Sequence, residues 1–484
     1  MKTIKYIIIF LLLQSLVFIN ILPTMADTKN GWSYYDGEIT SKSAIIIDAD
    51  SSKILFSYNQ DERLYPASLA KIMTAIVVLD YVKGNYDTLV NFSYTAVTRD
   101  IDRNSVTIGA SAGDQLSIKD CLYCLLLPSA NDAANALAEY VAGSINDFAL
   151  LMNEKAEMLG LKNTHFVNPS GLHDDEQYTT AYDMAKILQY AMKYPIFYQI
   201  SSSISYRHAP IRRYKNPDNS NNQVLNTNSI MVPGSGYYYN GITSGKTGHT
   251  KLAGYNLAAS ARKDGMNLIC VLLGSAKDSI RYNETKSLFD FHFDNYKSLS
   301  IKEFDKRFDD SISNISIDDV NLIESLNITC DENAHITLPK NADENDVTSK
   351  ISYQIDDPYN VYAIGNIQYY LKDEPIGKCT LEGRNFEDIE AIYTVYLNLS
   401  KALEESEVDE VSNVKTTTNK TNALIYRNSN GHLVISSTLM TVFIIIITSI
   451  LIISIITFLY IRVFSNTNIQ INKLLFRLRR KFKN

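Results

Sequence analysis

Lys71 is the residue of this 484-residue sequence whose surroundings most strongly indicate chemistry. It is the only charged residue in an apolar helical run from Ser68 to Leu79. Burial of an unpaired ammonium group is costly, and a common response is a depressed pKa that leaves the amine uncharged. Ser68 stands three residues earlier, so a helix would place both side chains on one face. A serine hydroxyl beside an uncharged amine is a nucleophile with its own general base.

The start of that helix supplies a second requirement of acyl transfer. Pro66 and Ala67 place Ser68 in the first turn, where backbone N–H groups lack partners within the helix. Such donors are suited to stabilise an oxyanion. The spacing itself is a weak signal, because Ser-x-x-Lys recurs at Ser260–Lys263 and Ser412–Lys415, where a solvated surface explains it.

Two further short motifs contain residues of the same chemical types. Ser129–Asn131 follows a proline at a predicted helix junction, but its Ser-x-Asn pattern recurs at Ser144–Asn146 and Ser220–Asn222. The Lys-Thr-Gly motif at 246–248 precedes an apolar strand pair, so its lysine could lie on an edge strand that faces the first helix. An exposed edge lysine that hinders strand pairing would give the same pattern. A phosphate-binding loop is excluded here, because Asn240 stands where that motif requires glycine.

In order and context, the three motifs resemble those of the low-molecular-weight penicillin-binding proteins, the D-alanyl-D-alanine carboxypeptidases typified by penicillin-binding protein 5. The resemblance extends from about Ala44 to about Ser400. Beyond the motifs it includes Tyr65–Thr74, Leu126–Ala134, Asn168–Leu172, Thr179–Ala185 and Ala253–Ala258. Two departures are visible. Gly245 stands where the family usually has an apolar residue, and a full membrane span replaces the amphipathic surface helix of many relatives.

The resemblance implies a reaction and three catalytic residues. Ser68 would attack the carbonyl between the two terminal D-alanines of a peptidoglycan stem pentapeptide, and Lys71 would take its proton. Ser129 would help to relay a proton to the leaving D-alanine. Water would then hydrolyse the acyl-enzyme and release a tetrapeptide, whereas a β-lactam would acylate Ser68 in the same way and leave slowly. Neither a metal nor a cofactor is called for.

The resemblance also implies a substrate-binding set, most of it on the strand of the Lys-Thr-Gly motif. Asn131 would bind the substrate amide. Lys246 and Thr247 would hold the terminal carboxylate, and Gly248 belongs to the same binding segment. The backbone N–H of His249, together with that of the nucleophile, would form the oxyanion hole. Lys246 would also lower the pKa of the catalytic lysine by like-charge repulsion.

Two other functions fit parts of the pattern. A β-lactamase needs a carboxylate that activates the deacylating water, and Asp174, Asp175 and Glu176 lie between the second and third motifs. A non-catalytic wall-binding or scaffold protein could retain the fold, although the intact serines and lysines argue against it. Fast hydrolysis of penicillin would favour the first alternative, and a serine variant without effect on cells would favour the second.

Hydrophobic periodicity and capping residues predict the elements that position these motifs. Strands are predicted at 44–48, 53–58, 252–261 and 266–274, as two hairpins, the second with its turn at Asp264 and Gly265. Helices are predicted at 69–82, 117–127, 132–141 and 180–192, with capping-box patterns that begin at Ser117 and Thr180. Strands at both ends with helices between them indicate an antiparallel sheet flanked by helices. With the resemblance, this predicts an α/β (α+β) transpeptidase/β-lactamase-like catalytic domain over 27–297.

The sequence pattern changes near residue 298, and this change predicts a second domain. Short β-type runs alternate with turn clusters up to about residue 400, at 327–329, 335–338, 361–363, 367–371 and 391–399. This pattern is typical of a small all-β domain. Residues 401–432 are polar, acidic and then rich in Thr and Asn, so they predict a flexible linker.

The two ends of the chain predict its location. Residues 1–26 have a basic start, an apolar stretch and small residues before a cut, which are the parts of a secretory signal peptide. An uncleaved anchor is the alternative. Residues 433–461 form an uncharged apolar run long enough for a transmembrane helix. The basic tail at 462–484 would stay in the cytoplasm. The catalytic domain would then be extracytoplasmic in a single-pass protein of the cell membrane.

Charge and cysteine content argue against two further classes. The net charge is −7, yet both ends are basic, so −16 falls on the residues between them, which disfavours nucleic acid as a partner. Five cysteines in a chain of this length do not resemble a disulfide framework. Cys121 and Cys124 lack the second ligand pair of a zinc site and lie in an apolar run, so a core position is expected. A bridge between Cys330 and Cys379 is left open.

Overall fold

The computed structural model describes residues 32–101, 105–308, 328–331, 333–352 and 363–383, and the backbone of 425–427 and 433–435. The chain divides into two compact units, Met1–Glu390 and Ala391–Asn484. The predicted signal peptide, the predicted strand at 391–399 and the basic tail lie outside the described residues. Within the described ranges, no helix is both long and apolar enough to cross a bilayer.

The first unit contains a five-stranded antiparallel sheet in the order β2-β1-β9-β8-β7. Its strands are β1 (Ser43–Asp48), β2 (Ile54–Tyr58), β7 (Ile242–Thr250), β8 (Gly254–Lys263) and β9 (Met266–Ser275). Both predicted hairpins are confirmed. Asp264 and Gly265 join β8 to β9 with φ angles of 51° and 82°, which suit a two-residue turn. The segment that carries Lys246 is β7, at one edge of the sheet.

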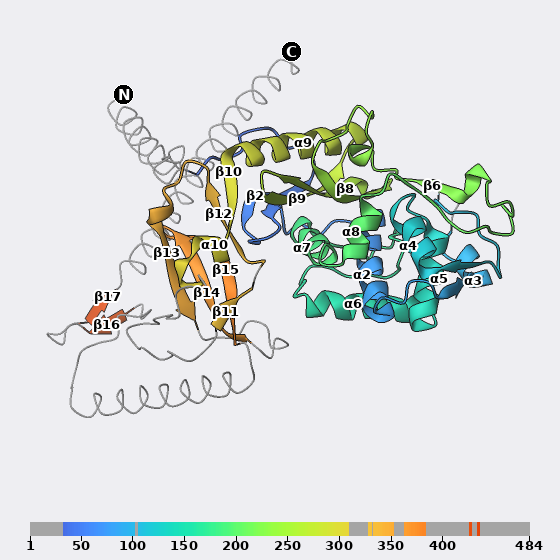
Figure 1. Cartoon of the computed structure of the whole chain (residues 1–484), viewed down its shortest axis with the longest axis horizontal. Coiled ribbons are helices and arrows are strands. Elements are labelled where there is room, and N and C mark those ends of the chain that lie inside the picture. The colour runs from blue at the N-terminus through green and yellow to red at the C-terminus, as the bar shows by residue number, and fades with distance from the viewer. Residues whose placement is uncertain are drawn as a thin grey trace, which may run out of the picture. The chain divides into compact units, whose positions relative to one another are not determined.

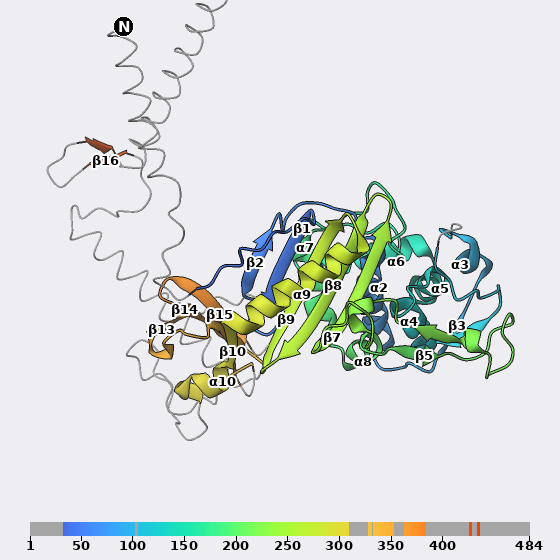
Figure 2. The same cartoon turned by 90° about the horizontal axis from the view of Figure 1, so that it is seen from above.

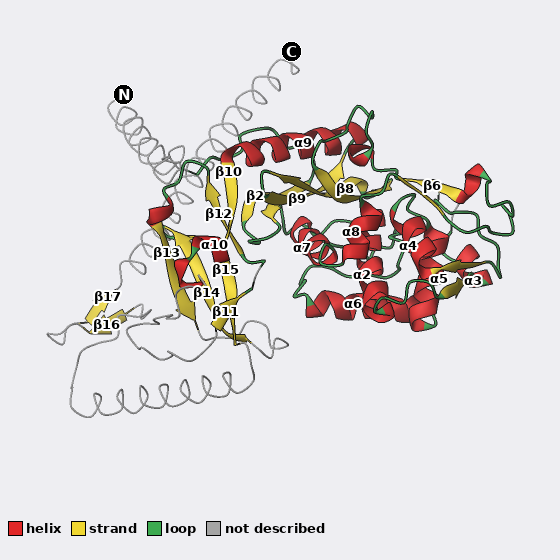
Figure 3. Ribbon diagram, in the orientation of Figure 1, coloured by secondary structure: helices red, strands yellow, loops and turns green. Residues whose placement is uncertain are grey.

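Helices cover both faces of this sheet (Figures 1 and 2). On one face α9 (Asp278–Asn295) packs against β8 and β9. On the other face, α7 (Ala181–Ala191) contacts β1 and β9, and α8 (Pro195–Ser201) contacts β7. Most of the regular structure between β2 and β7 is helical (Figure 3), including α3 (Tyr94–Thr98), α4 (Ile118–Leu126), α5 (Asn131–Ala142) and α6 (Ile145–Met158). The predicted antiparallel sheet flanked by helices is confirmed.

Two short antiparallel strand pairs lie within the helical part, and the sequence patterns did not predict them. They pair β3 (Leu89–Asn91) with β4 (Gln115–Ser117), and β5 (Ser205–Arg207) with β6 (Gln223–Leu225). Each strand has only three residues, which is too short for alternation of polar and apolar residues to be recognised.

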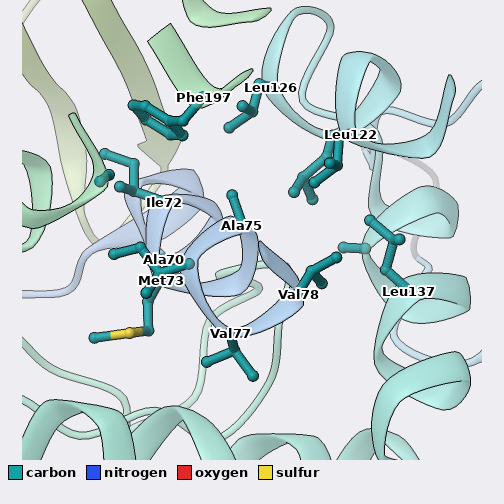
Figure 4. Close-up of a cluster of buried hydrophobic side chains, with 14 of the residues drawn as sticks. Ala70, Ile72, Met73, Ala75, Val77, Val78, Leu122, Leu126, Leu137 and Phe197 are labelled. Carbon is teal, nitrogen blue, oxygen red and sulfur yellow. The ribbon is translucent and has the colours of Figure 1, made fainter. Parts of the chain in front are cut away.

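The helix α2 (Ala70–Val82) runs through the centre of this part of the protein, preceded by a 3₁₀ turn, η2 (Ala67–Leu69). It is buried almost all round, as its apolar sequence predicted, and it packs against α4, α5, α6 and α7. Figure 4 shows Ile72 on the side of Phe197, and Val78 beside Leu137. Close packing on all sides fixes the position of the helix, and therefore of any side chain that its first turn carries.

Local capping residues begin α4 and α7 where the sequence predicted. Ser117 accepts a hydrogen bond from Asp120 N at 3.0 Å, and the Asp120 carboxylate accepts one from Ser117 N, so a capping box begins α4. Thr180 accepts from Asp183 N at 3.0 Å and begins α7.

Residues 296–383 add strands beyond the large sheet. They form a pair, β10 (Tyr296–Ser300) with β12 (His335–Pro339), and a four-stranded sheet in the order β11-β15-β14-β13. The latter strands are β11 (Ile328–Cys330), β13 (Val347–Ser352), β14 (Ala363–Leu371) and β15 (Glu374–Gly383). A short helix, α10 (Ile301–Phe304), lies among them, so the prediction of a purely β segment is wrong in that detail. One helical turn lies between two of these strands. Its residues do not show the alternation of polar and apolar side chains that identifies a strand.

In the second unit the structure describes one small hairpin, β16 (Ile425–Arg427) with β17 (Leu433–Ile435). The first strand falls in the predicted linker at 401–432. The second occupies the first residues of the predicted transmembrane helix at 433–461, whose remaining residues lie outside the described ranges.

All five cysteines are buried, and no disulfide joins them. Cys121 and Cys124 lie in the core on α4, as predicted. Cys330 and Cys379 lie on the neighbouring strands β11 and β15, where their thiols hydrogen-bond to each other.

Candidate active site

Ser68 lies in the 3₁₀ turn that begins the buried helix, and two glycines press against this turn. A Cβ on Gly171 would lie 1.9 Å from Ala67 O, and a Cβ on Gly248 would lie 2.8 Å from Pro66 O. Any larger residue at either position would force the backbone apart. Ala67 itself has a φ of 49°, in the left-handed region that non-glycine residues rarely adopt. Two distant segments and a strained turn therefore hold Ser68 in place.

Lys71 is fully buried one turn further along, and its Nζ has three oxygen partners. It lies 3.1 Å from Ser68 Oγ, 2.7 Å from Asn131 Oδ1 and 2.5 Å from the carbonyl oxygen of Ser170. Burial lowers the pKa of Lys71 well below its ordinary value, and the charge of Lys246 lowers it further. The carboxylate of Asp132 acts in the opposite direction. Burial and the charge of Lys246 therefore favour the uncharged form of this amine.

The second motif brings two residues to the site. Asn131 hydrogen-bonds to Lys71, whereas Ser129 has no such bond within the described ranges. Asn131 is the first residue of α5; its Nδ2 donates to Ser105 Oγ at 3.3 Å, which leaves Oδ1 for the lysine. Ser129 has a φ of 73°, and its buried Oγ has no hydrogen-bond partner among the described residues. A hydroxyl in that state is free to bond to a substrate.

The third motif lies along β7. Lys246 is 2% exposed, and its Nζ donates to the carbonyl of Thr247 at 2.9 Å. Burial, with a contribution from the nearby Arg281 guanidinium, lowers the pKa of Lys246 to about 7. His249 is exposed at the surface of the strand and stacks on Tyr255 with ring centroids 4.1 Å apart. Burial and Arg281 both lower the pKa of His249.

Two groups of the site were missed by sequence reasoning. Arg281 on α9 is buried and donates to Gly248 O at 3.1 Å and to Asn256 O at 2.8 Å. It therefore links α9 to β7 and β8. No motif marks it. The Ser170 carbonyl lies in a segment already noted for its resemblance, but a backbone atom leaves no residue-type signal. Thr74 of α2 anchors that segment by donating to Pro169 O at 2.7 Å.

The glycine before the Lys-Thr-Gly motif has a structural explanation. A Cβ on Gly245 would lie 2.8 Å from Asn228 Nδ2, and Asn228 is itself buried. The amide of Asn228 thus occupies the space that an apolar side chain at position 245 would need.

Among the carboxylates that would favour a β-lactamase, Asp174 and Asp175 have other partners. Asp174 accepts a hydrogen bond from Glu176 N at 2.9 Å, and Asp175 is exposed and lies 3.3 Å from His173 Nε2. In the part of the chain that the structure describes, neither they nor Glu176 contact Ser68 or Lys71 through a hydrogen bond.

The mixed α/β fold, with a serine and a buried lysine at the start of its core helix, defines the class of penicillin-binding serine hydrolases. The chain belongs to the D-alanyl-D-alanine carboxypeptidase family, whose model matches residues 28–277. It is a low-molecular-weight penicillin-binding protein and a serine-type carboxypeptidase.

Named relatives agree with this assignment. The chain is 30% identical over 354 residues to D-alanyl-D-alanine carboxypeptidase DacF of Bacillus subtilis, which covers 70% of this chain and 84% of that protein. It is 33% identical over 351 residues to DacC of Escherichia coli, at 70% and 82% coverage. The crystal structure of penicillin binding protein 5 from Haemophilus influenzae superposes with a TM-score of 0.55 and 26% identity, over 73% of this chain and 99% of that one.

Proposed function

We propose that this carboxypeptidase removes the terminal D-alanine of peptidoglycan stem pentapeptides through an acyl-enzyme on Ser68, with Lys71 as the general base. The partners of Lys71 Nζ are the observation that supports this. A neutral amine has two N–H donors and one lone pair. Asn131 Oδ1 and the Ser170 carbonyl can only accept, so they take both donors. The lone pair is then left for the Ser68 hydroxyl, 3.1 Å away.

Acylation follows from that arrangement. Ser68 Oγ bonds to the carbonyl carbon as its proton passes to Lys71 Nζ, and the carbonyl electron pair moves to oxygen. The backbone N–H groups of Ser68 and His249 stabilise this oxyanion. When the oxyanion collapses, the C–N bond breaks and the leaving D-alanine amine takes a proton relayed through Ser129. Water then attacks the ester, with the lysine again as base, and releases the tetrapeptide.

Lys246 and Thr247 would hold the carboxylate of the terminal D-alanine. With a pKa of about 7, Lys246 is only partly charged when the site is empty. An arriving carboxylate would raise that pKa and complete the protonation. The positive charge then remains near Lys71 and continues to favour its neutral form.

Export and anchoring complete the proposal. A signal peptide at 1–26 would export the chain, and the apolar run that ends at 461 would hold it in the membrane with the basic tail inside. If the run begins after β17, at residue 436, it still exceeds the roughly 20 residues that a span needs.

The decisive experiment uses the full-length protein in detergent with a stem pentapeptide and a fluorescent penicillin. We expect mass spectrometry to find the tetrapeptide and free D-alanine, and the label to map to Ser68. Lys71→Ala should reduce the labelling rate by about 10²–10⁴-fold, because a general base contributes that much. Undiminished labelling of that variant would remove the base assignment. Turnover of penicillin much faster than D-alanine release would indicate a β-lactamase instead.

The role of Lys246 is tested by two substitutions. We expect Lys246→Ala to reduce D-alanine release more than Lys246→Arg, because only arginine retains a cation for the substrate carboxylate. Rates with the pentapeptide measure the difference. An equal loss in both variants would show that charge at this position is not what matters.

A further inference from the structure

Asp132 is a buried carboxylate next to the candidate active site, and its hydrogen-bond partners are all backbone N–H groups of the described residues. It is 1% exposed in the first turn of α5. Both of its oxygens lie 3.1 Å from Ile108 N, Oδ2 accepts from Ala110 N at 3.3 Å, and Oδ1 accepts from Ala133 N at 2.9 Å. Gly109 N is a further donor. A carboxylate that gathers donors from one loop fixes that loop in place.

The loop that Asp132 holds, residues 105–110, also hydrogen-bonds to Asn131, the residue before Asp132. Val106 O accepts from Asn131 N at 2.7 Å, and Ser105 Oγ accepts from Asn131 Nδ2 at 3.3 Å. The nitrogen end of the Asn131 amide is thereby turned toward the loop. Its oxygen end is turned toward Lys71 Nζ, 2.7 Å away.

The negative charge of Asp132 also acts on Lys71, because it raises the pKa of that lysine. The ionisable groups that face the carboxylate are Lys71 from α2 and the thiols of Cys121 and Cys124 from α4. Lys246 faces the catalytic lysine from β7. Burial raises the pKa of Asp132, and its backbone donors counteract that rise.

We propose that Asp132 is a positioning residue of this site: its carboxylate ties loop 105–110 to α5, and so orients the Asn131 amide that receives Lys71. The inference rests on the proposed function, because it assumes that Lys71 acts as the base. Asp132 itself touches neither the nucleophile nor the lysine through a hydrogen bond.

The test is Asp132→Asn in the full-length protein, followed through the rate of Ser68 acylation by a fluorescent penicillin between pH 4 and pH 9. An amide nitrogen in place of one oxygen would face backbone N–H donors, so the loop would be released. We expect the rate to fall by about tenfold or more on the neutral plateau. Loss of the negative charge also lowers the pKa of Lys71, so the acid limb of the profile should move to lower pH.

Asp183 provides a matched control. It is also a buried carboxylate in the first turn of a helix, and it accepts from Asn163 N at 3.0 Å and Thr164 Oγ1 at 2.7 Å. It does not contribute to the pKa of Lys71. We expect Asp183→Asn to lower the melting temperature without moving the acid limb. An unmoved or upward-moved limb in Asp132→Asn, or the same shift in the control, would overturn the proposal.

A second variant covers the case in which Asp132→Asn does not fold. Ser105→Ala removes the acceptor of Asn131 Nδ2 but leaves the Asp132 charge in place. We expect a several-fold slower acylation with the acid limb unchanged; an unchanged rate would refute the positioning role. If the wild-type protein is not acylated at Ser68, the proposed function fails first. Normal wild-type acylation with normal Asp132→Asn and Ser105→Ala rates refutes this inference alone.

Discussion

Under the proposed mechanism the two buried lysines of the site take opposite charge states, and the surroundings of each side chain set the difference. Lys71 is fully buried and its Nζ has three oxygen partners, whereas Lys246 has only the carbonyl of Thr247 beside its Nζ among the described residues. A substrate carboxylate would supply the missing partner. Without substrate, the buried Lys246 lowers the stability of the folded protein. Such a cost in stability is common at functional sites.

We expect Lys246→Met to stabilise the protein at neutral pH and to have little effect at high pH. Burial lowers the pKa of Lys246 to about 7, whereas a lysine in an unfolded chain titrates near about 10.4. Between these values the unfolded state binds more protons, so wild-type stability decreases as pH falls from about 10 to about 7. Methionine removes that loss, with a gain of about 1–4 kcal/mol at pH 7. Thermal unfolding of both proteins at pH 7 and pH 10 checks this, and an equal difference at both pH values would contradict it.

At the scale of elements, the segment 168–172 matters because it supplies a backbone acceptor to α2. Asn168 Oδ1 accepts from Gly171 N at 2.8 Å and closes the turn, while the Thr74 hydroxyl holds Pro169 from the helix side. The turn brings Gly171 onto Ala67 and the Ser170 carbonyl onto Lys71. Displacement of this one segment would therefore disturb both Ser68 and Lys71.

Gly171→Ala tests that dependence against a matched glycine. Gly171 has a φ of 79° and its Cβ would collide with Ala67 O, whereas Gly160 has a φ of 70° and no atom within 4 Å of a Cβ. Both substitutions carry the cost of a left-handed alanine, about 1–2 kcal/mol. Only Gly171→Ala should also slow penicillin labelling, by more than tenfold. Labelling rates that fall equally in both variants would mean that the collision is relieved elsewhere.

The sequence predicted the elements whose signals are local. The Ser117 capping box, the Asp264-Gly265 turn and the apolar α2 each depend on residues within a few positions of one another, and each is found in the structure. Arg281 and the Ser170 carbonyl could not be predicted in this way. They act across the fold, through atoms or contacts that only tertiary packing brings together.

At the scale of the whole first unit, the large sheet is joined to the later strands by a buried polar contact. Asp48 at the end of β1 is fully buried; its Oδ2 accepts from Thr337 Oγ1 on β12 at 2.7 Å, and Oδ1 accepts from Asp50 N at 2.8 Å. Ser51 Oγ lies 2.5 Å from the same threonine hydroxyl. Burial raises the pKa of Asp48, and the threonine counteracts that rise.

Removal of that threonine hydroxyl should affect stability and not catalysis. We expect Thr337→Val to cost about 1–3 kcal/mol, because it leaves a buried carboxylate oxygen without its donor. Penicillin labelling should be unchanged, since the contact involves β1 and the site lies at β7, the opposite end of the strand order from β2 and β1. Thr348→Val, at an exposed position of β13, is the control. A labelling defect in Thr337→Val at a temperature where it is folded would show that the later strands influence the site.

The two buried lysines, Lys71 and Lys246, should affect the enthalpy of unfolding that calorimetry measures. Burial lowers the pKa of both groups in the native protein, that of Lys246 to about 7, whereas both are ammonium groups at neutral pH once the chain unfolds. Heat denaturation must therefore draw hydrogen ions from the buffer. The enthalpy recorded in a scanning experiment would consequently differ between phosphate and Tris, which release their protons with different heats, and the difference would shrink in the doubly methionine-substituted protein.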